Sequence, residues 1–147
     1  MTPRPPAKKM MIIDACVLID FIKADRTVLE LVVNHVGPLH VLSPIIAEVK
    51  EIDENELADL GLTVIEWDIE DASNAGERSR ALSFNDWLCL LTAKRHSFTC
   101  VTNDISLRKE CNAQDVSLMW GFNLLAELHN IGGIFAKEAE KIAQEIR

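Results

Sequence analysis

Short apolar runs alternate with longer amphipathic stretches along most of this chain. The runs at residues 10–13 and 39–42 are almost wholly apolar and too short for helices, so they predict buried strands. Similar runs predict three further strands, at residues 62–67, 98–102 and 116–120.

Between these runs, the apolar residues take the spacing of helices. Ser43 before Pro44 predicts an N-cap with proline at the first helical position, and Ser83 predicts a second N-cap. The expected helices begin at residue 15 and span 27–35, 44–52, 55–60, 68–81, 84–97, 106–111, 122–130 and 136–146. The last of them carries its apolar residues on one face, which predicts packing on the body of the protein or on a partner.

Apolar strands separated by helices of about ten residues indicate a parallel sheet with helices on both faces. The 147 residues are the length of one ordinary domain. We therefore expect a single three-layer α/β domain over residues 9–147, with a small parallel sheet of about five strands. The proline-rich residues 1–8 are expected to form a loose leader.

Composition and charge limit the classes of function that this chain can have. Hydrophobic residues make up 48% of the chain, which is enough for a folded core. The 15 Lys and Arg residues against 23 Asp and Glu give a net charge of −8 and a pI near 4.9. A protein this acidic cannot hold a phosphate backbone by bulk attraction, so it would need a local basic patch or bound cations.

Cysteines and apolar segments bear on the compartment. The four cysteines lack metal-ligand spacing, so we expect reduced thiols in a cytoplasmic protein and no zinc site. Acidic residues interrupt the amino-terminal apolar run, and no segment reaches transmembrane length, so neither secretion nor a membrane is expected.

Four acids fall where the predicted sheet would present the carboxyl ends of its strands. Asp14 closes the first strand and Asp104 follows the fourth, while Glu48 and Asp86 lie on helices that could reach the same edge. Two carboxylates about 5 Å apart repel by roughly 3 kcal/mol, so such a cluster must take up protons or bind a cation. Carboxylate oxygens suit Mg²⁺ or Mn²⁺, and a bound ion would let an acidic protein attack a polyanion.

Each acid also has an ordinary structural explanation. Asp14 and Asp104 could cap the helices that follow them, and Asp86 could form a capping box with Ser83. Glu48 could be an exposed helix residue, although its apolar neighbours argue against this. The occurrence of all four in order favours metal binding or catalysis by the set.

The stretches that hold these acids resemble the successive motifs of the PIN domain family, which includes the VapC toxin ribonucleases. They lie at residues 14–21, 44–49, 86–93 and 102–104, and the resemblance covers residues 10 to about 120. It implies a Mg²⁺- or Mn²⁺-dependent endoribonuclease that hydrolyses phosphodiester bonds of single-stranded or structured RNA by metal-activated water. By motif matching, the catalytic, metal-binding acids would be Asp14, Glu48, Asp86 and Asp104.

The resemblance also implies partners and alternatives. It implies a homodimer and, for a toxin of a toxin–antitoxin pair, an antitoxin that inserts a basic side chain among the carboxylates. Cys16 stands where the family usually has Ser or Asn, so a hydrogen bond that supports Asp14 in the family could be missing here. Leu107 stands where many members have another acid, which questions a second metal ion. The alternative hypothesis is therefore a degenerate PIN-like binding module without turnover.

Other residues are weaker candidates. Thr102, Asn103, Arg78 and Arg80 are candidate substrate contacts, the arginines through phosphate. Thr102 and Asn103 could equally be a strand-end hydroxyl and a turn residue. The basic residues 94–96 are expected to form a solvated helix end. All three tryptophans, Trp67, Trp87 and Trp120, are expected by default in the core or an interface, and Trp87 beside Asp86 is the only one considered near the substrate channel.

Overall fold

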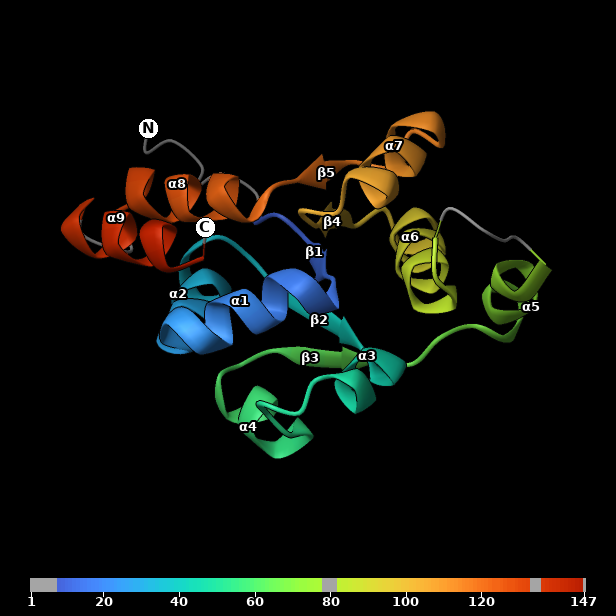
Figure 1. The fold of residues 1–147 in the computed structure, drawn as a ribbon, viewed down its shortest axis with the longest axis horizontal. Coiled ribbons are helices and arrows are strands. Elements are labelled where there is room, and N and C mark those ends of the chain that lie inside the picture. Colours follow the sequence, from blue (N-terminus) through green and yellow to red (C-terminus); the bar gives the residue numbers. More distant parts are fainter. Residues whose placement is uncertain (1–7, 78–81, 133–135, 147) are drawn as a thin grey trace, which may run out of the picture.

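A parallel sheet forms the centre of the molecule (Figure 1). The computed structural model describes residues 8–77, 82–132 and 136–146. Its strands are β1 (Met11–Ile13), β2 (Leu39–Leu42), β3 (Thr63–Ile65), β4 (Thr99–Val101) and β5 (Leu118–Met119). They are all parallel and lie side by side in the order β3-β2-β1-β4-β5.

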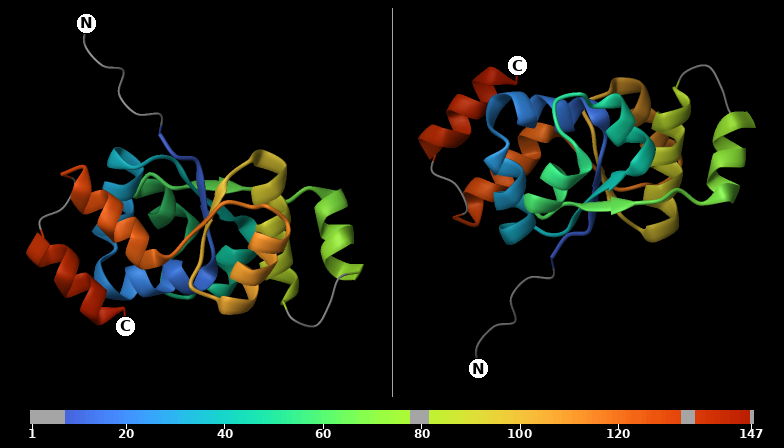
Figure 2. Two further views of the ribbon diagram at one scale, coloured as in Figure 1. Left: turned by 90° about the horizontal axis from the view of Figure 1, so that it is seen from above. Right: turned by 90° about the horizontal axis from the view of Figure 1, so that it is seen from below.

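Helices cover both faces of this sheet (Figure 2). They are α1 (Ala15–Asp25), α2 (Thr27–His35), α3 (Ser43–Glu48), α4 (Glu54–Asp59), α5 (Ile69–Glu77), α6 (Phe84–His96), α7 (Ile105–Ala113), α8 (Gly121–Asn130) and α9 (Ala136–Glu145). Helices α1, α2, α8 and α9 gather on one face, while α6 and α7 lie on the other with α5 packed outside α6. The predicted three-layer α/β fold is confirmed.

The order of the strands fixes where a site can form. The chain runs outward from β1 through β2 to β3, then returns to the other side of β1 to form β4 and β5. This reversal makes the junction of β1 and β4 the switch point of the sheet, where ligands of open parallel sheets bind beyond the carboxyl ends. Because Ile13 is paired with Val101, the next residues of the two strands emerge side by side at that edge.

Some predicted boundaries differ from the observed ones. The helix at 27–35 and the strand at 39–42 are confirmed, but α3 ends at Glu48 because the backbone of Val49 is extended. Ser43 is not the N-cap of α3. It is the first helical residue, and its hydroxyl donates to Glu66 at 2.8 Å.

Two of the packing predictions have clear outcomes. The basic residues 94–96 at the end of α6 are all exposed, as predicted, and Arg95 also donates to both carboxylate oxygens of Asp71, at 2.8 and 3.0 Å. This buried acid ties α5 to α6. The final helix packs on the body of the protein through Ile142, as predicted, in contact with α8 and α1. No helix in the described part of the chain is both long and apolar enough to cross a membrane.

Gly37 is required by a close approach of two backbone segments between α2 and β2. A Cβ added there would lie 2.0 Å from the carbonyl oxygen of Lys9. We expect Gly37→Ala to destabilise the fold by at least about 2 kcal/mol, measured by denaturant unfolding. Gly76 lies in α5 with no atom within 4 Å of an added Cβ, so Gly76→Ala should stabilise the protein by about 0.5–1 kcal/mol. Equal stabilities of the two variants would contradict this interpretation.

Candidate active site

Asp14 lies at the centre of the switch point. It directly follows β1 and precedes α1, and its residue is only 2% exposed. One carboxylate oxygen accepts the backbone N–H of Val17 at 3.1 Å, which caps α1, and the other accepts the hydroxyl of Thr102. The thiol of Cys16 lies 3.2 and 3.3 Å from the two oxygens. A carboxylate has about four acceptor positions, so these three donors leave capacity for a cation.

The surroundings of Asp14 disfavour its negative charge. Burial is the main cause that raises the pKa of the Asp14 carboxyl above its usual value, and the charge of Asp86 adds to it. Hydrogen bonds from Thr102, Val17 and Cys16 oppose this shift without cancelling it. Burial and the Asp14 charge also raise the pKa of the Cys16 thiol to about 12. The thiol therefore stays protonated near neutral pH and can donate to Asp14.

Thr102 links Asp14 to the second acid of the site. Its side chain is fully buried, and its hydroxyl oxygen accepts the backbone N–H of Asp104 at 3.0 Å while its proton goes to Asp14. Asp104 is exposed and caps α7 by accepting the N–H of Leu107 at 2.9 Å. The predicted substrate contact Asn103 has a structural partner, since its side-chain oxygen accepts the N–H of Gly121 at 2.9 Å. One hydroxyl thus connects the carboxylate of Asp14 to the backbone of Asp104.

The other two predicted acids approach from helices. Asp86 is half-buried in the first turn of α6, which packs against β1 and β4, and forms the predicted capping box with Ser83. Its charge acts on Asp14, which places it near the same edge. Glu48 is exposed, contrary to the expectation from its apolar neighbours. Its carboxylate accepts a hydrogen bond from Asn85, the neighbour of Asp86, so it forms the outer end of the set.

The chemistry of these acids suits a hard cation. Among the described residues, no three or more His, Cys, Asp or Glu side chains form a group that could hold a metal ion. Mg²⁺ commonly uses one or two carboxylates and keeps several waters, so Asp14 with Asp104 or Asp86 would have the number and kind of donors that this ion takes. Asp14 gains most from such a cation, because burial and the negative charge of Asp86 both disfavour its ionised form.

The structure also places three other residues that the sequence singled out. The hydrogen bond questioned at Cys16 is present, because a thiol replaces the hydroxyl or amide of the family motif. Leu107 is fully buried, so its side chain belongs to the core and not to the acidic edge. Trp87 is only 6% exposed and packs in the core, which is the default expectation for the tryptophans. The candidate phosphate contacts Arg78 and Arg80 lie outside the described residues.

Two more residues follow the strands at this edge: Arg108, which the sequence did not single out, and Trp120, which was expected in the core or an interface. Trp120 directly follows β5, and its residue is 40% exposed. The guanidinium carbon of Arg108 in α7 lies 3.5 Å from the centroid of its ring. Arg108 also donates to the backbone carbonyl of Thr102 at 3.4 Å. The spacing of Arg108 four residues after Asp104 was the available sequence signal, because one helical turn separates such residues.

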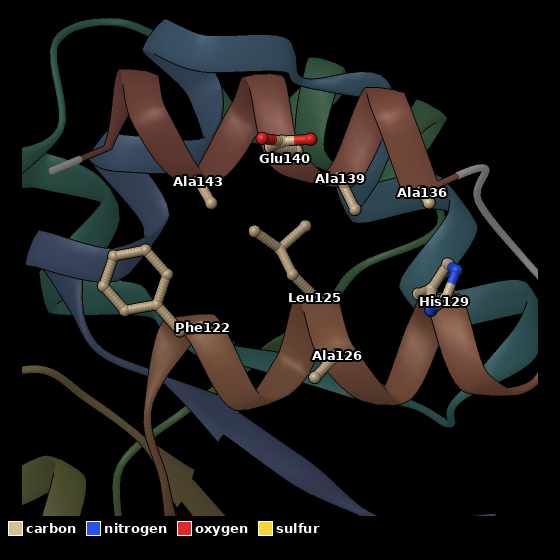
Figure 3. A pocket seen from close by; sticks show the side chains of 8 residues that line it. All are labelled: Phe122, Leu125, Ala126, His129, Ala136, Ala139, Glu140 and Ala143. Atoms are coloured by element: carbon tan, nitrogen blue, oxygen red, sulfur yellow. The ribbon is translucent and has the colours of Figure 1, made fainter.

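A separate groove of about 260 Å³ runs between α8 and α9 (Figure 3). Leu125 points from α8 toward α9 between Phe122 at one end and His129 at the other. Small residues of α9, including Ala139 and Ala143, form the facing wall. The groove shares no residue with the acidic edge, and its apolar lining belongs to the packing of these two helices.

Comparison with known proteins supports the fold. The crystal structure of PAE2754 from Pyrobaculum aerophilum is similar with a TM-score of 0.55, at 17% identity over 83% of this chain and 96% of that chain. A likeness at this identity concerns the fold alone. Neither models of protein families nor curated proteins give a match.

The raised pKa of Asp14 predicts a stability that depends on pH. In the unfolded chain the Asp14 carboxyl has a pKa of 3.8, which is lower than its pKa in the folded protein. The free energy of unfolding therefore falls as pH rises from the unfolded to the folded pKa, and it stays lower at higher pH. We expect Asp14→Asn to melt at a higher temperature than the wild type at neutral pH in EDTA. The difference should vanish or reverse below pH 3.8, where both forms are neutral.

Thermal unfolding from pH 3 to pH 8 measures this difference, with Asp59→Asn as the control. Asp59 is exposed at the end of α4, so its substitution should leave the pH profile unchanged. A lower melting temperature for Asp14→Asn at neutral pH would show that the hydrogen bonds to the carboxylate outweigh its burial.

Proposed function

We propose that this protein is a Mg²⁺- or Mn²⁺-dependent ribonuclease that hydrolyses phosphodiester bonds of single-stranded RNA. The observation that carries this proposal is the junction of β1 and β4, where Asp14 and Asp104 are linked by Thr102 at the switch point of the sheet. The motif resemblance to the PIN domain family supports the same activity. A role as the toxin of a toxin–antitoxin pair, a homodimer and a cytoplasmic location belong to this proposal.

The chain's own residues have separate tasks in it. Asp14 and Asp104 hold the cation, with Asp86 reinforcing the negative field and Glu48 at the outer end. Thr102 and Cys16 orient Asp14 through their hydrogen bonds and keep its carboxylate directed toward the edge. The ion, when bound, supplies charge neutralisation at the phosphodiester and a water that ionises more readily. Without a cation, the negative field of these residues would repel RNA.

The second candidate is the binding module without turnover. It is favoured by Leu107, a buried apolar residue where many members of the family have another acid, and by the pI near 4.9. Such a module would bind RNA or a protein at the same edge and leave the RNA uncut. Cleavage assays separate the two candidates directly.

Asp14→Asn and Asp104→Asn should each lower the Mn²⁺-dependent cleavage of a labelled single-stranded RNA by at least about 100-fold. The loss follows because each variant removes one charged ligand while the fold remains. Asp59→Asn, purified in the same way, should cleave at the wild-type rate and also controls for contaminating nuclease. EDTA should abolish the activity of the wild type. Cleavage by Asp14→Asn at the wild-type rate would contradict the proposal, and an uncut RNA with every protein would favour the binding module.

Thr102→Val should lower cleavage by about 10- to 100-fold, because Thr102 positions a metal-binding acid. The hydrogen bond from Thr102 lowers the pKa of Asp14, so its loss should also move the pH dependence of cleavage to higher pH. Thr92→Val is the matched control. Thr92 is equally buried, but its hydroxyl has no hydrogen-bond partner among the described residues. An unchanged pH profile for Thr102→Val would assign Thr102 a purely structural role.

A further inference from the structure

A basic and an aromatic side chain are stacked at the carboxyl edge of the sheet. The guanidinium of Arg108 lies over the indole of Trp120, 3.5 Å from the ring centroid, yet 40% of Trp120 remains exposed. Ile105, the first residue of α7, is also exposed. The edge thus presents an exposed aromatic side chain next to a positive charge.

This pair is held in place relative to the acids. Arg108 donates to the carbonyl of Thr102, the same residue that binds Asp14 through its hydroxyl. On the other side, Gly121 donates to Asn103, and a Cβ on Gly121 would lie only 3.3 Å from the Asn103 side chain. Thr102 therefore also positions Arg108, and Asn103 positions Gly121, the neighbour of Trp120.

The separation suits a short stretch of nucleic acid. Strands β1, β4 and β5 are neighbours, and adjacent strands lie ~4.8 Å apart, so β5 lies roughly 10 Å from β1. Nucleotides advance ~3.4 Å each when stacked and farther when unstacked, so at most a few nucleotides span this separation. A strand whose phosphate lies at the acids can reach Trp120 with a neighbouring base.

We propose that Trp120 and Arg108 form a subsite that binds an unstacked base and the adjoining phosphate of single-stranded RNA. This inference rests on the proposed ribonuclease function and adds the part of the site that selects the substrate. The exposed indole stacks on the base, and the guanidinium N–H groups that Thr102 does not use donate to the phosphate. Bases inside a duplex are stacked on each other and cannot enter, so the subsite selects single strands.

The subsite also answers the charge problem of an acidic protein. With a net charge of −8, the chain has no bulk attraction for RNA. Arg108 places a permanent cation beside Thr102 and Trp120, and stacking adds a contribution that does not depend on charge.

The test compares two tryptophans of nearly equal exposure. Trp120 is 40% and Trp67 is 41% exposed, and they follow the strands at opposite edges of the sheet. Trp120→Ala should raise the KM for RNA cleavage by about 10-fold and leave kcat within about 2-fold. Trp120→Phe should keep most of the affinity, and Trp67→Ala should match the wild type. An RNA with abasic positions should show no difference between the wild type and Trp120→Ala.

A second readout needs no turnover. Oligouridylate should quench the intrinsic fluorescence of the wild type and Trp67→Ala saturably, but not that of Trp120→Ala. If Trp120→Ala cleaves RNA with the KM of the wild type and its fluorescence is still quenched saturably, the subsite is rejected and the ribonuclease proposal is retained. Quenching that depends on Trp120 without any cleavage would support the subsite and reject the ribonuclease. The absence of both quenching and cleavage would reject both.

Discussion

Parallel pairing of β1 with β4 holds two distant segments of the chain at one edge of the sheet. The register of Ile13 with Val101 brings Asp14 next to Thr102, and a single hydroxyl then connects Asp14 to the backbone of Asp104. Helix α6 packs on the same two strands and carries Asp86. A shift of one residue in this pairing would turn the side chain of Thr102 to the opposite face and separate the acids.

The site combines a buried charge with the contacts that make it tolerable. Asp14 is removed from water and lies in the field of Asp86, both of which disfavour its ionised form. Three donors of different kinds, a backbone amide, a hydroxyl and a thiol, restore part of the lost solvation. We propose that a divalent cation offsets the rest of the unfavourable charge of Asp14. Arg108 adds a positive charge in α7, the helix that follows the neighbouring strand β4.

The sequence predicted the architecture well, because its signals are local. Uninterrupted apolar runs indicate buried strands, and residues such as Ser83 mark the starts of helices. The expected places of Asp14 and Asp104 followed from the strand ends alone. The extended backbone at Val49, which ends α3 early, depends on tertiary packing and carries no local signal.

The side-chain contacts of the site could not be predicted in the same way. Whether Glu48 is buried depends on the direction in which α3 leaves β2, and its apolar neighbours gave the wrong expectation. The stacking of Arg108 on Trp120 joins residues of two helix–strand units whose relative placement only the assembled sheet fixes. Likewise, the Cys16 thiol donates a hydrogen bond to Asp14 where the family motif, with Ser or Asn at this position, suggests that the bond is lost.

The decisive experiment is a crystal structure of the protein soaked in Mn²⁺, because anomalous scattering locates the ion independently of any activity. We expect a Mn²⁺ ion in contact with Asp14 and with at least one of Asp104 and Asp86, at the carboxyl ends of β1 and β4. An edge without an anomalous peak at saturating Mn²⁺, or an ion bound only elsewhere, would contradict this expectation.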